Sequence, residues 1–154
     1  MKVYLVRHGE AVSSQFYPQR PLSEQGFADI RKVASFIKSL EISVEHIWHS
    51  GKLRAAQTAE ILAESVSVEK DCSAHKNLMP NDDVTIIADE LEAYEADLMI
   101  VGHLPFLAYL TSLLVTGKQT ANVATFAAGA IACLNQRAPG QWQICWMITP
   151  KILT

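Results

Sequence analysis

Two arginines and two histidines in this sequence together suit the binding of a multiply charged anion. Arg7 and His8 are adjacent near the start of the chain, and Arg54 and His103 lie further along it. Guanidinium groups match the tetrahedral oxygens of phosphate and stay charged at any working pH. Neighbouring cations lower the pKa of an imidazole, so one of the histidines can stay neutral and nucleophilic. If the four side chains meet, they can carry out phosphoryl chemistry.

The chemistry that such a pocket would support is transfer of a phosphoryl group to a histidine. A neutral imidazole that attacks phosphorus gives a phosphohistidine enzyme, which water then hydrolyses. The transition state spreads negative charge over three equatorial oxygens, which the other three side chains could stabilise. Helix N-termini expected at Ser50 and near Pro105 would add backbone N–H groups that favour the anion.

The sequence predicts an alternation of strands and helices that could bring these residues together. Short apolar runs predict buried strands, which cover residues 3–6, 46–49, 66–68 and 98–101. Apolar residues at helical spacing predict helices, which cover residues 23–40, 50–64, 82–94 and 105–116. Ser23 is the expected N-cap of the first helix. Two further strands, 130–134 and 142–148, are joined by a turn that contains Pro139 and Gly140.

This pattern predicts an α/β fold, specifically a three-layer α/β/α sandwich with a mainly parallel central sheet and a C-terminal antiparallel hairpin. Ligands of such sheets bind beyond the carboxyl ends of the strands. Arg7 and His8 follow the first strand, Arg54 lies one turn into the helix after the second, and His103 follows the strand at 98–101. The four residues are therefore expected to face one pocket.

Four segments resemble, in the same order, the motifs of the histidine phosphatase superfamily, also called the phosphoglycerate mutase-like family. These segments are residues 7–9, 20–26, 50–59 and 101–105. Within that superfamily, the short length and the segment 78–84 look most like SixA-type phosphohistidine phosphatases. The matches extend over residues 2–107, so the resemblance covers the first two thirds of the chain.

The resemblance implies a hydrolase with roles for five residues. His8 would be the nucleophile, and Arg7, Arg54 and His103 would bind the phosphoryl group. Arg20 would be a peripheral phosphate contact. No cofactor is expected, and the expected partner is a protein that carries phosphohistidine.

The residue that supplies a proton to the leaving group stays open. Larger members of the family place a general-acid carboxylate on an inserted lid, for which this chain has little room. Glu10, Asp82 and Asp83 are candidates, and the sequence selects none of them. A site without such an acid suits phosphohistidine on a protein surface, because its imidazole leaves more readily than an alkoxide. The alternatives are a phosphatase or mutase of small phosphomonoesters and a non-catalytic module that binds phosphorylated ligands, although an intact His8 argues against the latter.

Several other polar residues are expected to have structural roles. Three histidines outside the motifs are expected to be hydrogen-bonded in the fold, namely His46, His49 and His75. Gln57 and Thr58 lie one turn beyond Arg54 on the same helical face, so we expect them to support its side chain. Lys52 reads as a solvated helix residue.

Composition limits the remaining function classes. A length of 154 residues predicts one domain, residues 1–154, and 49% apolar against 19% charged residues predicts a folded chain. The 13 basic and 16 acidic residues give a net charge of −3, which disfavours a nucleic-acid partner. Three scattered cysteines are too few for a disulfide framework or a zinc site.

Metal and membrane binding are also disfavoured. The chain has no His-Glu-x-x-His motif, and arginines beside the candidate histidines would repel a cation. Residues 98–117 lack charged side chains, yet Gly102 and Pro105 break this stretch, so it is better read as a strand, a turn and a helix. The first residues lack the pattern of a secretory signal peptide. We therefore expect a metal-independent, cytoplasmic protein that does not span a membrane.

Overall fold

The structure, a computed structural model, describes residues 1–153 of the chain. Within them, six strands form one sheet: β1 (Lys2–Arg7), β2 (Ser43–His49), β3 (Ser67–Ala74), β4 (Leu98–Gly102), β5 (Ile131–Ala138) and β6 (Gln141–Ile148). The helices are α1 (Glu24–Lys38), α2 (Leu53–Ala63), α3 (Val84–Glu92), α4 (Phe106–Thr116) and the short 3₁₀ helix η1 (Pro150–Ile152).

The sheet has the strand order β3-β2-β4-β1-β5-β6. The pairs β2–β3, β2–β4 and β1–β4 are parallel, whereas β5 runs antiparallel to both β1 and β6. The predicted fold class, with its parallel sheet and terminal antiparallel hairpin, is confirmed.

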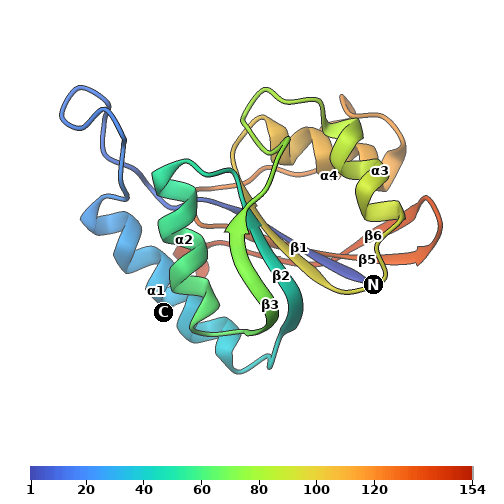
Figure 1. Cartoon of the computed structure of the whole chain (residues 1–154), viewed down its shortest axis with the longest axis horizontal. Coiled ribbons are helices and arrows are strands. Elements are labelled where there is room, and N and C mark those ends of the chain that lie inside the picture. Colours follow the sequence, from blue (N-terminus) through green and yellow to red (C-terminus); the bar gives the residue numbers. More distant parts are fainter. Residues whose placement is uncertain (154) are drawn as a thin grey trace.

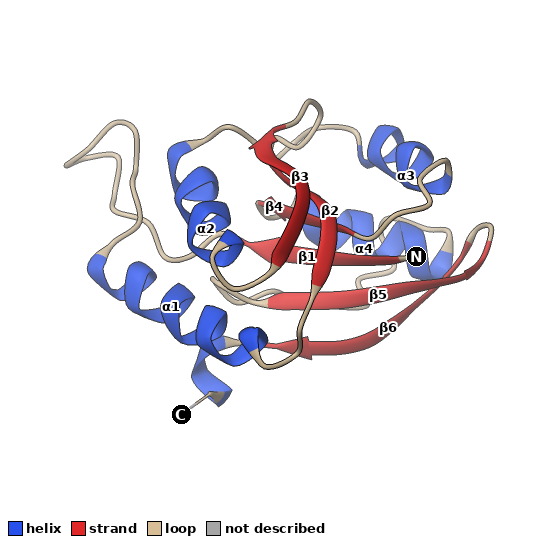
Figure 2. Cartoon of the chain, turned by 60° about the horizontal axis from the view of Figure 1, so that its bottom comes forward, coloured by secondary structure: helices blue, strands red, loops and turns tan. Residues whose placement is uncertain are grey.

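Helices cover both faces of the sheet. Figures 1 and 2 show α1 and α2 on one side and α3 and α4 on the other. Side chains of β1 alternate between these layers: Val3 and Leu5 pack with α3 and α4, whereas Tyr4 and Val6 pack with α1 and α2. Burial on both faces explains why β1 and β4 are continuous apolar runs. The stretch 98–117 divides into β4 and α4, and no helix in residues 1–153 is long and apolar enough to cross a bilayer.

The edge strand β3 is longer than the sequence predicts. It extends to Ala74 rather than ending at Val68, and Glu69, Lys70 and Asp71 in its middle are exposed. An edge strand has one open side and carries polar residues there. The apolar run that predicts a buried strand therefore marks only its beginning.

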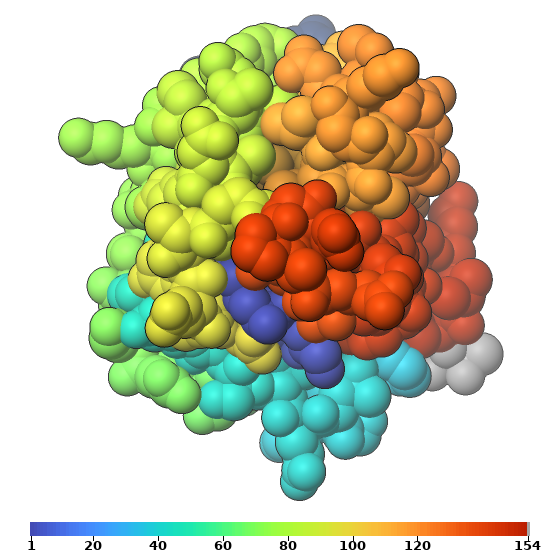
Figure 3. Space-filling model, turned by 90° about the vertical axis from the view of Figure 1, so that its right-hand side faces the viewer, coloured from blue at the N-terminus to red at the C-terminus, as the bar shows by residue number. Residues whose placement is uncertain are grey.

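Hydrogen bonds join the hairpin of β5 and β6 to the end of α3. The carboxylate of Glu92 accepts hydrogen bonds from the side chain of Gln136 at 2.9 Å, the backbone of Gly140 at 3.0 Å and the indole of Trp142 at 2.8 Å. Figure 3 shows the hairpin turn, in red-orange, beside the yellow segment that ends α3. This contact joins the antiparallel part of the sheet to the helical layer.

The start of α1 fixes the chain that leaves β1. Ser23 caps the helix as predicted, because its hydroxyl accepts a hydrogen bond from the Gly26 N–H at 3.0 Å. The Ser23 N–H donates to the carbonyl of Glu10 at 2.9 Å. A Cβ atom at Gly26 would clash with that carbonyl, so glycine is needed for this close approach. The segment that carries His8 is therefore held against α1.

Candidate active site

The four side chains singled out from the sequence lie together at the carboxyl ends of the parallel strands. Arg7 ends β1, His103 follows β4, and Arg54 is in the first turn of α2. The rings of His8 and His103 have centroids 5.0 Å apart, and Nε of Arg54 lies 3.3 Å from Nε2 of His8. The His8 N–H donates to the carbonyl of Gly102 at 3.0 Å, which joins the ends of β1 and β4.

The imidazole of His8 is held in a form that can act as a nucleophile. Its Nδ1 lies 2.7 Å from the carbonyl oxygen of Gly9, which can only accept, so Nδ1 carries the proton. Burial lowers the pKa of His8 to about 4; the Gly9 contact opposes this, and Arg54, Arg7 and Arg20 lower it further. His8 is therefore neutral at pH 7, and its Nε2 carries an unprotonated lone pair that accepts a hydrogen bond from the Nε–H of Arg54.

The imidazole of His103 is buried and contacts Ser50. Its Nε2 lies 2.6 Å from the Ser50 hydroxyl, and its Nδ1 is buried without a hydrogen-bond partner. Burial lowers its pKa to about 3, and the charges of His8, Arg54, Lys52 and Arg20 act in the same direction. His103 is therefore also neutral at pH 7.

The prediction that Ser50 begins and caps α2 is wrong. The helix begins at Leu53, and its N-cap residue Lys52 has no side-chain cap. Gly51 has φ +90°, a left-handed conformation that turns the chain before the helix starts. This turn leaves the Ser50 hydroxyl to accept from the Lys52 N–H at 3.3 Å and to contact His103.

The two arginines are oriented by the surrounding backbone. Nη1 of Arg7 donates to the carbonyl of Phe126 at 2.8 Å, whereas its Nε is buried and unpartnered. Burial lowers the pKa of both Arg7 and Arg54, and nearby Arg20 adds to the effect on Arg54. A guanidinium remains charged despite such shifts, so the pocket holds two fixed positive charges.

These charges have no carboxylate partner. Within residues 1–153, every ion pair lies elsewhere, between His46 and Asp71, Lys70 and Glu45, and His75 and Glu90. No Asp or Glu oxygen of these residues therefore lies within 4.0 Å of the Arg7 or Arg54 guanidinium. The same described part of the chain has no group of three or more His, Cys, Asp or Glu side chains arranged to hold a metal ion. An arginine pair without acidic neighbours can bind a dianion.

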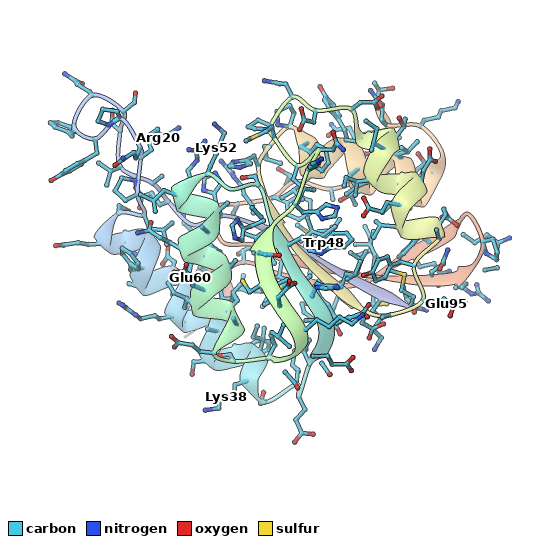
Figure 4. The ribbon with its side chains drawn as sticks, in the orientation of Figure 1. Arg20, Lys38, Trp48, Lys52, Glu60 and Glu95 are labelled. Carbon is cyan, nitrogen blue, oxygen red and sulfur yellow. The ribbon has the colours of Figure 1, made fainter. Side chains whose placement is uncertain are left out.

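Arg20 and Lys52 add positive charge around the pocket without bonding to the four central residues. Arg20 has φ +49°, and its Nε donates to the carbonyl of Val12 at 3.1 Å. Its charge lowers the pKa of both His8 and His103. Figure 4 shows Arg20 and Lys52 at the same edge of the molecule, beyond the start of α2.

The three candidate proton donors lie outside hydrogen-bonding contact with the central residues. Glu10 is exposed, and Asp82 accepts from the Met79 N–H at 2.9 Å. Asp83 caps α3 by accepting from the Thr85 N–H at 2.9 Å and the Thr85 hydroxyl at 2.8 Å, which lowers its pKa. Asp83 is thus the least suited to hold a proton, and Glu10 and Asp82 remain.

Thr58 links the two motifs that carry the nucleophile and the arginine. Its buried hydroxyl accepts from the Gly9 N–H at 3.1 Å and donates to the Arg54 carbonyl at 2.8 Å. Gln57 instead accepts from the Leu22 N–H at 2.8 Å. Both residues support the backbone around the pocket rather than the Arg54 side chain. Among the other histidines, His46 bonds to Asp71, His49 to the backbone of Gly51 and His75 to Glu90.

Sequence reasoning missed Ser50 as a contact of His103 and Lys52 as a charge near the pocket. Both residues lie in the segment 50–59 that carries Arg54. Their position within this motif was the sequence feature that could have identified them as pocket residues. Their actual contacts depend on the turn at Gly51, which the sequence pattern does not show.

Comparisons with known proteins find one family model and two relatives that are similar to this chain. A family model described as the histidine phosphatase superfamily (branch 1) matches residues 3–79. The chain is 27% identical to phosphohistidine phosphatase SixA of Escherichia coli (strain K12), over 97% of this chain and 94% of that protein. It is 32% identical to an uncharacterised protein of Picosynechococcus sp., over 77% of this chain and 75% of that protein.

Solved structures show the same fold. The structure of the protein histidine phosphatase SixA complexed with tungstate superposes with a TM-score of 0.88 at 27% identity, and the match covers 99% of each chain. The putative phosphohistidine phosphatase SixA from Agrobacterium tumefaciens gives a TM-score of 0.78 at 22% identity, with 97% of each chain covered.

Proposed function

Because this chain belongs to the histidine phosphatase superfamily, we propose that it is a phosphatase that removes phosphate from phosphohistidine on a partner protein. One observation carries the proposal: His8 is fixed with its proton on Nδ1, and its Nε2 lone pair faces a pocket with two arginines. The similarity to SixA over nearly the whole chain supports the same substrate class.

The reaction proceeds in two displacement steps at phosphorus. In the first, Nε2 of His8 attacks phosphorus, the P–N bond of the substrate breaks, and its electron pair leaves with the substrate imidazole, which takes up a proton. In the second, water attacks phospho-His8 and the electron pair of the P–N bond returns to Nε2. The proton of that water passes to solvent, and phosphate leaves.

The arginines bind the phosphoryl group and expose the nucleophile. The Nε–H of Arg54 donates to Nε2 of His8 at 3.3 Å. Phosphate oxygens are stronger acceptors than this nitrogen, so bound substrate draws the guanidinium away and frees the lone pair. Arg7 and His103 complete the contacts to the equatorial oxygens.

Within residues 1–153 no carboxylate makes a hydrogen bond or ion pair with the pocket residues, which favours phosphohistidine over a phosphoester. An ester needs its leaving alkoxide protonated in the transition state. Glu10 and Asp82, the remaining candidate acids, make no hydrogen bond to the central residues described here. An imidazole can leave after taking a proton from solvent, so the substrate needs no acid held by the enzyme.

A substrate comparison tests the proposal. Wild type and His8→Ala are assayed on a phosphohistidine protein and on a panel of small phosphomonoesters, with no metal added. We expect kcat/KM to be highest for the phosphohistidine protein and His8→Ala to be inactive on all substrates. A preference for a phosphomonoester would instead assign the chain to the small-molecule phosphatases of the superfamily.

A further inference from the structure

The loop between β1 and α1 carries two aromatic side chains into solvent. We call residues 13–19 of this loop the aromatic tip. Phe16 is 73% exposed and Tyr17 is 59% exposed, far more than the core aromatic residues. Figures 1 and 2 show this loop standing away from the helices and the sheet. Neither side chain contributes to the core, so their exposure calls for another explanation.

The aromatic tip is held by its own hydrogen bonds. At the base, the Val12 N–H donates to the carbonyl of Pro21 at 2.8 Å. Within the tip, the Phe16 N–H donates to the Ser13 carbonyl at 3.1 Å. The Arg20 N–H donates to the Tyr17 carbonyl at 3.0 Å. A loop ordered in this way presents its side chains at a lower entropic cost of binding than a flexible one.

The base of the loop carries an arginine whose positive charge acts on the histidines of the phosphate pocket. Arg20 lies at this base, and its charge lowers the pKa of His8 and His103. Residues 11–23 contain no Asp or Glu, so Arg20 is their single charged side chain. In Figure 4 Arg20 lies between this loop and Lys52. The loop that carries the aromatic tip therefore begins next to the positive charge that would hold an anionic group at His8.

The length of the loop indicates how large the ligand must be. Phe16 is four residues beyond the base at Val12, a separation of at most about 13 Å, and Figures 1 and 2 show the loop standing away from the helices and the sheet. A small phosphorylated metabolite that fills the pocket does not span this additional distance. A protein does, and Tyr and Phe are enriched in the centres of protein interfaces.

On these grounds, and resting on the proposed function, we infer that Phe16 and Tyr17 form a docking contact for the protein that presents phosphohistidine to His8. The partner's phosphoryl group meets Arg7, Arg54 and Arg20, while an apolar patch next to its phosphohistidine packs on the aromatic tip.

Kinetics on two substrates with the same leaving group test this docking contact. The substrates are free phosphohistidine and a histidine-containing phosphotransfer domain phosphorylated with phosphoramidate. The test variant is Phe16→Ser/Tyr17→Ser. The matched control is Phe36→Ser, at an apolar residue of α1 that is 42% exposed. We expect the test variant to lose roughly ten- to hundredfold in kcat/KM on the phosphorylated domain, mainly through KM. Its activity on free phosphohistidine, and both activities of the control, should stay within about twofold of wild type.

Each other outcome overturns a stated part of the inference. Equal activity of the test variant and wild type on the phosphorylated domain overturns the docking contact alone. Equal losses on both substrates also overturn it, because the aromatic tip would then act on the pocket rather than on the partner. If wild type accepts free phosphohistidine and rejects the domain, both the contact and the protein substrate are wrong. Activity on neither substrate contradicts the proposed function itself.

Discussion

The hydroxyl of Ser50 lies 2.6 Å from Nε2 of His103, and both side chains are buried. Because His103 is neutral at pH 7, only one of its nitrogens carries a proton. The Ser50 oxygen accepts from the Lys52 N–H, and its own proton is free to point at Nε2. When the hydroxyl donates to Nε2, the imidazole proton lies on Nδ1, which is buried and has no hydrogen-bond partner.

Removing the Ser50 hydroxyl should therefore impair turnover. Ser50→Ala leaves Nε2 of His103 buried without a partner, which costs about 1–3 kcal/mol. We expect kcat to fall roughly tenfold or more as His103 loses its fixed orientation. Ser50→Thr keeps the hydroxyl and should retain most of the wild-type rate. Steady-state kinetics and thermal unfolding of both variants measure this, and an unchanged kcat in Ser50→Ala would show that His103 is oriented without Ser50.

A covalent intermediate on His8 should be trapped by rapid quenching. Phosphate on an imidazole nitrogen is acid-labile and base-stable, unlike a phosphate ester of serine. We expect labelled wild type to carry such phosphate and His8→Ala to carry none, with turnover abolished in the variant. Mass spectrometry under alkaline conditions identifies the modified residue. Substantial activity in His8→Ala would falsify the two-step mechanism.

The lowered pKa of His8 should also make the free energy of unfolding depend on pH. Burial lowers this pKa from 6.5 to about 4, so between these values the unfolded chain binds a proton that the folded chain does not. The free energy of unfolding should therefore fall as the pH drops from 6.5 towards 4, by up to roughly 3 kcal/mol from this residue. His8→Asn lacks this contribution. Urea unfolding across the pH range should give a shallower decline for the variant, and parallel curves would contradict the assigned shift.

Activity should not depend on a divalent metal, because Arg7 and Arg54 already supply fixed positive charge to the phosphoryl group. We expect full kcat after dialysis against a chelator. Loss of activity that zinc or magnesium restores would count against this.

The sequence predicts the central strands and the four pocket residues better than it predicts the edge of the sheet. β1 and β4 are buried on both faces, so their apolar runs identify them, and the residues after them are necessarily at one edge of the sheet. The polar edge strand β3 is only half buried, so its apolar run is short. The contact of Ser50 with His103 joins residues from two strand ends, and no local pattern encodes it. The aromatic tip lies in a loop, so no helical or strand periodicity of the sequence predicts the exposure of its two aromatic side chains.

The pocket should divide its work between binding phosphate and accelerating its transfer. Arg7 and Arg54 are charged in every state, so either change to Ala should weaken the binding of phosphate or vanadate. Each such contact is worth about 1.5–3 kcal/mol, which corresponds to roughly a ten- to hundredfold loss. His103 is different because its pKa of about 3 keeps the free imidazole neutral at pH 7, and a neutral group attracts the incoming dianion weakly.

The hydrogen bond from His103 to the phosphoryl group should strengthen when negative charge moves onto the equatorial oxygens. This strengthening occurs in the transition state. We therefore expect His103→Ala to lower kcat far more than it weakens phosphate binding. Titration of the three Ala variants with inorganic phosphate, paired with their kinetics, separates the two effects. Loss of phosphate affinity in His103→Ala with near-normal kcat would make His103 a binding residue, equivalent in role to the arginines.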